Sequence, residues 1–279
     1  MADLVARESD VIRTISPNEQ MPAEDIEIYL SAGRSALECI SLSLHAGQKR
    51  PSEVRRILDL PCGHGRVLRY LKAAFPDAEI TACDILPDAV DFCASTFGAI
   101  PVYSDADPAT IPIKDNAFDL IWVGSLFTHL DVDLWSRFLS VFRSFLHPTG
   151  VLVFTTHGYD AYRRMVTDNF NYGIPYYRKT AILYNYERHG FGYVKYPGSN
   201  SYYGLSLSDP AWVVTHIAKF GGLRIVCFSE KGWVNFHDSF ACVRDSDWKE
   251  SHANVSPYLY LKHKISELIK GLHVPFYRR

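Results

Sequence analysis

The chain lacks several features that would assign a protein quickly to a class. Its 279 residues contain no apolar run as long as a membrane span, and the charged segment 1–22 has no apolar core of a signal peptide. Lys and Arg (29) nearly balance Asp and Glu (31), which leaves a formal net charge of −2. A broad basic field that would attract nucleic acid is therefore absent. We expect neither a membrane span nor a nucleic-acid partner.

Cysteine is sparse and scattered. No two of the six cysteines form a Cys-x-x-Cys pair, so the pattern predicts neither a zinc site nor a disulfide framework, and no metal site is expected. Their apolar surroundings favour packing as small hydrophobic side chains, which fits a reducing, cytoplasmic compartment. The six are Cys39, Cys62, Cys83, Cys93, Cys227 and Cys242.

The most informative segment that is present is 54–66. It is typical of a buried strand, a tight glycine turn and the start of a helix over 66–74. Gly63 and Gly65 let the backbone approach a ligand closely, because neither has a Cβ atom. The N–H groups at the start of the following helix point toward that ligand.

Acidic residues close two successive strands of this pattern. Asp59 ends the strand before the glycine turn, and Asp84 ends the strand over 78–84. A Rossmann-type fold places the carboxylate that holds a ribose at the position of Asp84. The sequence therefore predicts a nucleotide-like ligand.

The residues around and after Gly63 indicate which ligand this is. Leu68 occupies the place of the third glycine of the dinucleotide fingerprint, so a nicotinamide cofactor is disfavoured. The run Asp59-Leu60-Pro61-Cys62-Gly63-His64-Gly65 resembles motif I, D/E-x-G-x-G-x-G, of the class I S-adenosylmethionine-dependent methyltransferases. Pro61 replaces the first glycine and cannot donate a backbone N–H. Because the other elements are in place, we expect this change to be tolerated.

Later segments resemble the same family in the same order. The resemblance covers roughly residues 50–245 and implies an α/β, Rossmann-like fold. Its sheet has seven mainly parallel strands with an antiparallel last strand. The further segments are a third strand at 99–105, a fourth at 116–125 containing FDLI, a helix at 133–146, a fifth strand at 151–157 after the turn 147–150, a helix at 209–220 and a final hairpin at 223–229 and 239–243.

Four short sequence runs resemble one subgroup of this family. They lie at 125–130 (SLFTHL), 154–158 (FTTHG), 203–207 (YGLSL) and 232–233 (GW). They resemble bacterial members that are associated with glycan and cell-surface polysaccharide biosynthesis. The resemblance suggests a sugar hydroxyl as acceptor without fixing it.

The chain divides into an N-terminal segment with a lid helix (1–48), a methyltransferase domain (49–245) and a C-terminal helical tail (246–279). Apolar residues over 23–45 recur with helical spacing. In the family such a helix often covers the cofactor, but it could equally cover one edge of the sheet. The basic tail could touch an anionic membrane surface, or pack on its own protein or a partner subunit.

The resemblance implies S-adenosylmethionine as cofactor and S-adenosylhomocysteine as product. Asp84 should hold the ribose hydroxyls, Ser104 should line the adenine and Ser125 should line the methionine end. The expected cofactor residues are Asp59, Pro61, Cys62, Gly63, Gly65, Arg66, Asp84, Ile85, Ser104, Asp105, Ala106, Gly124, Ser125 and Phe127.

Three histidines are candidate general bases, since an oxygen acceptor needs a base with a pKa near neutral. His129 follows the fourth strand, His157 ends the fifth, and His237 lies between the last two strands beside Asp238. Each also has a structural explanation. His129 could cap the next helix, His157 could be a buried strand-end residue, and His237 could be an exposed turn residue.

The segment 158–207 holds most of the tyrosines and shows little periodicity. Aromatic content disfavours disorder, so we expect an ordered insertion over the carboxyl ends of the strands, where open α/β sheets bind ligands. Its tyrosines could bind a sugar or aromatic acceptor, or could form a small core or a dimer contact. The acceptor candidates are Tyr29, Tyr159, Tyr203 and Trp233.

The sequence thus predicts a cytoplasmic enzyme that methylates a hydroxyl of a small molecule or a glycan, with a histidine as base. Methylation of nitrogen or carbon stays open, as does a non-catalytic cofactor-binding subunit. A nicotinamide-dependent reductase is the further alternative. A homodimer could form through the exposed aromatic insertion.

Overall fold

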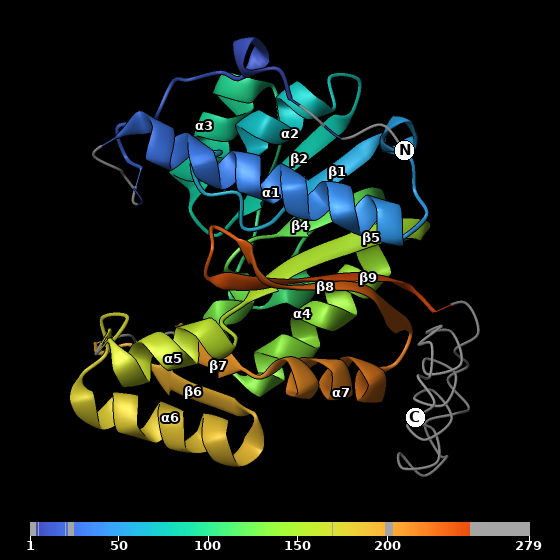
Figure 1. Cartoon of the computed structure of the whole chain (residues 1–279). Coiled ribbons are helices and arrows are strands. Elements are labelled where there is room, and N and C mark those ends of the chain that lie inside the picture. The colour runs from blue at the N-terminus through green and yellow to red at the C-terminus, as the bar shows by residue number, and fades with distance from the viewer. Residues whose placement is uncertain are drawn as a thin grey trace, which may run out of the picture.

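The computed structural model describes residues 4, 6–19, 21, 25–168, 170–198 and 203–245. A seven-stranded sheet lies at its centre, with the strand order β3-β2-β1-β4-β5-β9-β8 (Figure 1). The last strand, β9, runs antiparallel to both of its neighbours, whereas β1 to β5 pair in parallel. The predicted fold class is therefore confirmed. The strands are β1 (Arg56–Asp59), β2 (Glu79–Asp84), β3 (Ile100–Tyr103), β4 (Phe118–Val123), β5 (Leu146–Thr156), β8 (Leu223–Trp233) and β9 (His237–Arg244).

Helices cover both faces of the sheet (Figure 1), so its central strands are buried on both sides. All six residues of β4 are buried, with Trp122 facing one core and Ile121 facing the other. On one face lie α1 (Ile26–Ala46), α2 (Leu68–Ala74) and α3 (Pro87–Phe97). On the other face lie α4 (Val132–Phe145) and α7 (Pro210–Phe220).

Helix α1 begins where the Asp25 carboxylate accepts a hydrogen bond from the Glu27 N–H at 2.8 Å. Its buried stripe, including Leu30, Leu37 and Ile40, packs beside α2 and against β5 and β8. The helix therefore covers a face of the sheet, rather than an edge. Its N-terminal half continues toward the glycine turn and lines a cavity there.

The predicted insertion is an α/β unit with a core of its own. It contains α5 (Tyr159–Thr167), α6 (Tyr176–His189) and the antiparallel pair β6 (Phe191–Lys195) and β7 (Gly204–Ser208). Its tyrosines divide between the two expected roles. Tyr186 packs into the insertion core, whereas Tyr176 is 78% exposed.

Element boundaries differ slightly from the prediction. Helix α2 begins at Leu68 rather than Arg66, and β5 begins at Leu146 because the expected turn 147–150 continues the strand through a register shift. Four short 3-10 helices complete the described chain: η1 (Glu8–Asp10), η2 (Pro51–Glu53), η3 (Pro108–Thr110) and η4 (Leu126–Thr128). The predicted tail, 246–279, lies outside the described residues. Within the described part, none of the helices has the length and apolarity to cross a membrane.

Candidate functional site

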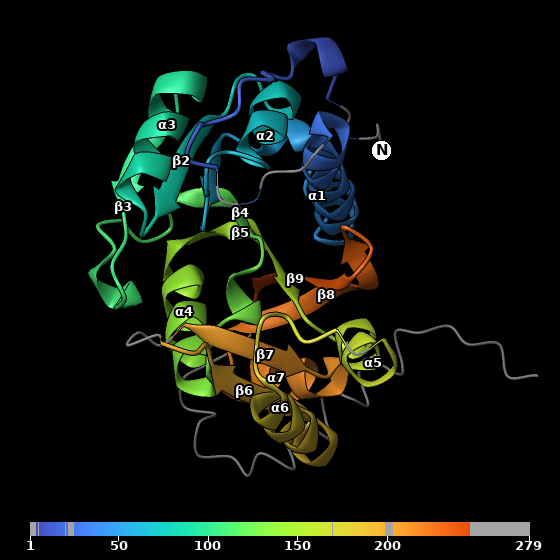
Figure 2. The same cartoon turned by 90° about the vertical axis from the view of Figure 1, so that its left-hand side faces the viewer.

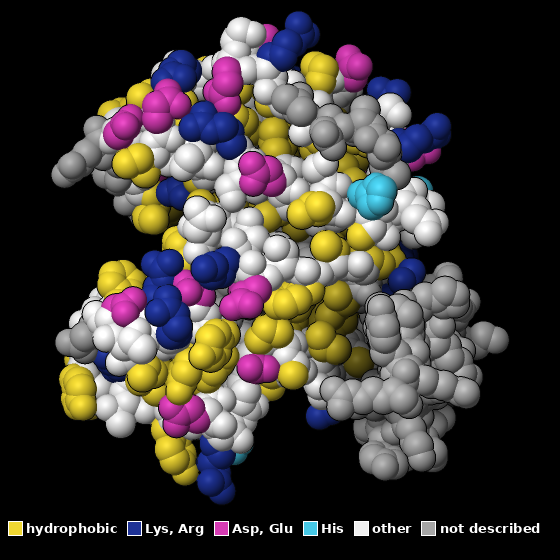
Figure 3. Space-filling view, viewed as in Figure 1, with side chains coloured by type: hydrophobic (Ala, Val, Ile, Leu, Met, Phe, Trp, Pro, Cys, Tyr) yellow, Lys and Arg dark blue, Asp and Glu magenta, His cyan; other side chains and the backbone are white. Residues whose placement is uncertain are grey.

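The carboxyl ends of the parallel strands β1, β2, β4 and β5 lie at one edge of the sheet, with the N-terminal helices on one side of the molecule and the insertion on the other (Figure 2). The space-filling view shows the surface indented between these two parts, at the left of the molecule (Figure 3). The glycine turn borders the cleft on one side, and the insertion borders it on the other. This is the edge at which the sequence predicts a ligand.

The glycine turn requires glycine for two different reasons. Gly63 (φ 47°) and Gly65 (φ 77°) both adopt the left-handed conformation. A Cβ atom at Gly65 would overlap the ring of Phe97, whereas a Cβ at Gly63 would meet nothing within 4 Å. Gly65 is therefore packed against α3, and Gly63 faces open space at the end of β1.

Two carboxylates stand beside this open space. Asp84 accepts hydrogen bonds from the N–H groups of Gly63 (2.8 Å) and Leu86 (3.1 Å), and burial raises its pKa. Asp59 is 1% exposed, and its Oδ2 atom has no partner among the described residues. Burial and the nearby charge of Asp84 raise the pKa of Asp59. An unpartnered buried carboxylate oxygen is costly, so a cationic or hydrogen-bonding ligand group would stabilise it.

The other expected cofactor residues of this region lie around the same edge. Ile85 is 56% exposed directly after β2, and Ser104 follows β3, where its N–H donates to the Asp84 carbonyl at 2.9 Å. Asp105 and Ala106, next along the chain, are exposed. Pro61 is half-buried at the start of the glycine turn, and the Cys62 side chain is buried beside Cys93, so Cys62 can offer only backbone atoms to a ligand.

The end of β4 bends sharply through Gly124 and Ser125. Ser125 is left-handed (φ 64°), and its N–H donates to the Thr155 hydroxyl at 2.8 Å. Phe127 lies elsewhere than expected, because its ring is 1% exposed among Trp135 and other core aromatics. Thr155 was missed by the sequence reasoning, since a threonine within an apolar run is typical of any strand.

The fold brings all three predicted histidines to this edge. The rings of His157 and His237 are 4.7 Å apart, and the charge of His129 acts on both. Burial lowers the pKa of each, to about 3 for His157. All three imidazoles are therefore neutral at physiological pH.

The hydrogen bonds of the three rings differ. Nδ1 of His129 lies 2.8 Å from the carbonyl oxygen of Gly204 in β7. Nδ1 of His237 lies 3.3 Å from the Thr155 hydroxyl, and Nδ1 of His157 is buried without a partner among the described residues. Asp238, expected as a carboxylate beside His237, instead accepts from the Lys231 N–H at 3.0 Å. The His237-Asp238 pair is therefore not joined.

The four predicted acceptor residues are separated by the fold. Tyr203 packs against His129 with ring centroids 4.5 Å apart, and burial together with the charge of Asp84 raises its pKa. Tyr159 is 53% exposed on the outside of α5. Tyr29 and Trp233 are buried. The Tyr29 hydroxyl donates to Glu19 at 2.5 Å, and the Trp233 indole donates to the Ala32 carbonyl at 2.9 Å.

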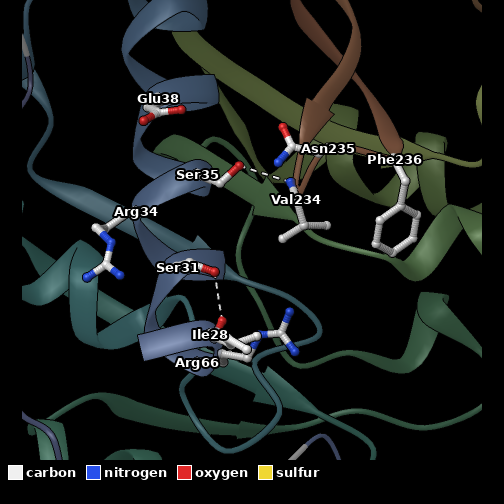
Figure 4. A pocket seen from close by; sticks show the side chains of 9 residues that line it. All are labelled: Ile28, Ser31, Arg34, Ser35, Glu38, Arg66, Val234, Asn235 and Phe236. Atoms are coloured by element: carbon white, nitrogen blue, oxygen red, sulfur yellow. Dashed lines mark hydrogen bonds between the residues drawn. The ribbon is translucent and has the colours of Figure 1, made fainter. Parts of the chain in front are cut away.

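A cavity of about 490 Å³ lies between α1 and the turn that joins β8 to β9 (Figure 4). Arg66, directly after the glycine turn, forms part of its wall, and burial lowers the pKa of this guanidinium. Phe236 lines the opposite wall and packs against His237, with ring centroids 4.4 Å apart. The cavity thus connects the glycine turn with the histidines.

Comparison with known proteins finds a family match over part of the chain. Residues 57–150 match the family described as methyltransferase domain. A fatty-acid O-methyltransferase of Mycolicibacterium smegmatis is 28% identical over 107 residues, which are 37% of this chain and 37% of that protein. A malonyl-[acyl-carrier protein] O-methyltransferase of Halalkalibacterium halodurans is 29% identical over 116 residues, which are 39% of this chain and 42% of that protein. The matches thus span about two fifths of the length of these curated relatives.

Solved structures share the fold. An S-adenosylmethionine-dependent methyltransferase from Clostridium acetobutylicum superposes with a TM-score of 0.52 and 14% sequence identity. The superposition covers 80% of this chain and 93% of that chain. At this identity the likeness shows the fold alone, and it includes most of the described chain.

Proposed function

We propose that this chain is a class I S-adenosylmethionine-dependent methyltransferase and that it methylates an oxygen atom of a small molecule or a sugar. The family cofactor supplies an electrophilic methyl group on a sulfonium. The protein must then hold the cofactor, position the acceptor and remove a proton from it. The two relatives compared above are both O-methyltransferases, which supports oxygen as the acceptor atom.

The cofactor side of the cleft fits S-adenosylmethionine. The Asp84 carboxylate suits the ribose hydroxyls, since a charge-assisted hydrogen bond contributes about 1.5–3 kcal/mol. The unpartnered Oδ2 of Asp59 suits the cationic methionyl end. Gly63 leaves open space between them. The remaining expected residues at the ends of β2, β3 and β4 would contact the adenine and the methionine chain.

The hydrogen bond between His129 and Gly204 is the observation that supports His129 as the general base. A carbonyl oxygen can only accept, so Nδ1 of His129 must donate its proton to Gly204 at 2.8 Å. The neutral ring then has its lone pair on Nε2. A lone pair held in a fixed orientation next to Tyr203 suits removal of a proton from an acceptor hydroxyl.

The other two histidines are less suited to this role. His157, with a pKa of about 3, is a weak base, and its free ring nitrogen is buried. The Thr155 hydroxyl already accepts from Ser125, so its own proton is available to Nδ1 of His237. In that arrangement Nε2 of His237 carries the ring proton and donates rather than accepts. We therefore assign His157 and His237 to positioning the acceptor.

We further propose that the insertion 158–207 binds the acceptor through Tyr203, and that the protein works in a reducing compartment, the cytoplasm. All six cysteines are free, and five of them are buried. A homodimer through the exposed aromatic residues of α6 stays a prediction.

Titration calorimetry tests the proposal. S-adenosylmethionine and S-adenosylhomocysteine should bind with micromolar affinity, and NADH should not bind. Turnover with hydroxyl acceptors, including nucleotide sugars and phenols, then tests the acceptor class. The absence of binding by either sulfur compound would overturn the proposed function.

The variant Asp84→Asn sharpens that test. We expect it to weaken S-adenosylhomocysteine binding about tenfold or more, because the ribose loses a charged partner. Asp91→Asn is the matched control, since Asp91 lies on the exposed side of α3, where it accepts from the Tyr103 hydroxyl at 2.6 Å. Equal affinities of the two variants would remove Asp84 from the cofactor site.

A further inference from the structure

Three arginines near the glycine turn differ in what their guanidinium groups bind. Arg69 donates to the carbonyl oxygens of Gly65 (3.0 Å), Ile12 (2.7 Å) and Thr14 (3.0 Å). Arg34 pairs with the carboxylates of Glu8 (3.2 Å) and Glu27 (3.3 Å). Both guanidinium groups are thus used to hold the chain together.

Arg66 has no such partner. Within the described residues its guanidinium forms neither a hydrogen bond nor an ion pair, and it lies over the ring of Tyr29, 5.8 Å from the centroid. The Glu19 carboxylate acts on its charge from a distance, and this carboxylate is already bound by the Tyr29 hydroxyl at 2.5 Å. A partly buried cation without an anion is unfavourable, because it loses hydration without gaining a counter-charge.

The surroundings of Arg66 indicate what could neutralise it. The guanidinium lies beside Ile28, across the cavity from Val234 and Phe236 (Figure 4). These three side chains form the apolar part of the cavity lining. The polar part consists of the Asn235 amide at the turn and of Ser31, Arg34, Ser35 and Glu38 on α1. Because Arg34 is already paired with two carboxylates, Arg66 is the cation of this lining that can bind a carboxylate, and the apolar side chains suit a ligand with an apolar part.

The backbone of the opposite wall is held in an uncommon conformation. Val234 (φ 48°) and Asn235 (φ 62°) are both left-handed, which is unfavourable for a β-branched residue such as valine. The Ser35 hydroxyl of α1 accepts from the Val234 N–H at 2.9 Å and so fixes the turn opposite Arg66. The cavity wall is therefore held in place by side-chain contacts with α1.

We propose that Arg66 binds a carboxylate of a ligand in this cavity, brought either by the acceptor or by the methionyl end of the cofactor. The inference rests on the proposed function, because it assumes that the glycine turn holds an S-adenosyl compound. Arg66 follows Gly65 directly, and its charge acts on His237, so a carboxylate held there lies between the cofactor turn and the histidines. Arginine can hold such a group with two parallel hydrogen bonds.

The test compares ligands that differ only in the carboxylate. Calorimetry uses S-adenosylhomocysteine against its decarboxylated analogue S-adenosyl-3-thiopropylamine, and octanoate against octanol with protein saturated by S-adenosylhomocysteine. In Arg66→Gln, one carboxylate ligand should bind at least about tenfold more weakly than to the wild type, while its carboxylate-free counterpart binds unchanged. A loss of affinity for S-adenosylhomocysteine would show that Arg66 binds the cofactor carboxylate. A loss of affinity for octanoate would show that it binds the carboxylate of the acceptor.

Two further variants complete the test. Arg34→Gln is the matched control, since Arg34 lines the same cavity but is already paired, and it should leave the carboxylate preference unchanged. Arg66→Lys keeps the positive charge but lacks the paired N–H donors. Its affinity for the carboxylate ligand should therefore fall by a smaller factor than that of Arg66→Gln. Arg66→Lys also carries the test if Arg66→Gln does not fold. This inference is wrong if the wild type binds S-adenosylhomocysteine and no Arg66 variant changes the affinity for either carboxylate ligand relative to its carboxylate-free counterpart. If the wild type does not bind S-adenosylhomocysteine, the proposed function fails.

Discussion

The glycine turn presents its ligand-facing groups from consecutive residues, whereas the opposite side of the cleft gathers His129, His157 and His237 from three separate strand ends. On the first side left-handed Gly63 and Gly65 fix the backbone geometry of the turn. On the second side the groups are side chains, held by hydrogen bonds such as that of His129 to Gly204. Under the proposed function, the glycine turn would make cofactor recognition largely a local property of the chain, whereas acceptor recognition would depend on its tertiary structure.

The two sides also differ in the charge state that burial favours. Burial raises the pKa of Asp59 and Asp84 on the cofactor side and lowers the pKa of the three histidines on the other. Both shifts disfavour the charged forms of these side chains. A cationic cofactor would stabilise charged carboxylates on one side while leaving the neutral imidazoles as acceptors and donors on the other.

The largest effect is expected from His129→Gln. It should lower kcat by about 10²–10⁴-fold, because the acceptor loses its base, and should leave S-adenosylhomocysteine affinity unchanged. His45→Gln, at an exposed position on α1, is the control. In the wild type the rate should fall only below pH 6.5, since burial lowers the pKa of His129 and only the neutral ring can accept a proton. A loss of cofactor affinity in His129→Gln would show that the two sides are not independent.

On the cofactor side, two glycine substitutions separate the effect on folding stability from the effect on ligand binding. Gly65→Ala should cost about 3 kcal/mol of unfolding free energy, from backbone strain and overlap with the Phe97 ring. Gly63→Ala should cost only about 1 kcal/mol, because its Cβ meets no atom. It should nevertheless weaken cofactor binding at least about tenfold by filling ligand space. Urea denaturation and calorimetry on both variants measure these effects, and an unchanged affinity of Gly63→Ala would contradict the placement of the cofactor.

The smallest effect concerns the stability of the acceptor side. His157 has a pKa of about 3 in the folded protein against 6.5 ordinarily, so the unfolded chain takes up the proton first as pH falls. Its contribution is complete above pH 6.5 and is lost between pH 6.5 and about 3, with about 2 kcal/mol lost at pH 5. Urea denaturation at pH 7.5 and 5 should show this loss in the wild type, and a smaller loss in His157→Asn. Equal losses would assign the pH dependence to other groups.

The difference between the two sides explains what could be predicted from sequence. Strand ends, the glycine turn and the two carboxylates follow from local patterns, and the seven strands with an antiparallel last strand follow from the family resemblance. The directions of Tyr29, Phe127 and Trp233 could not be predicted, because an aromatic residue beside a motif can face either the core or the cleft. Nor could the structure of the insertion, whose elements are short and pack on a core of their own.

Thr155 and Arg66 illustrate the same limit. The glycine motif marks Arg66 as an expected cofactor residue. Nothing in the sequence shows, however, that its guanidinium lacks a partner among the described residues, while that of Arg69, three positions later, donates to three carbonyl oxygens. The distinction depends on carbonyl groups of Ile12 and Thr14, far away along the chain. Likewise, Thr155 is marked only by the tertiary contacts that place it between Ser125 and His237.

Gly204 accepts from the His129 ring and donates its own N–H to the His129 carbonyl at 3.0 Å. A side chain at Gly204 would overlap the Val194 carbonyl, so this pair of bonds depends on glycine in β7. The consequence concerns evolution and engineering. If His129 is the base as proposed, an exchange of the insertion for one that accepts another substrate would also replace the group that sets its tautomer. Substrate range and reactivity would then be inherited together, and a graft that changes one would have to rebuild the other.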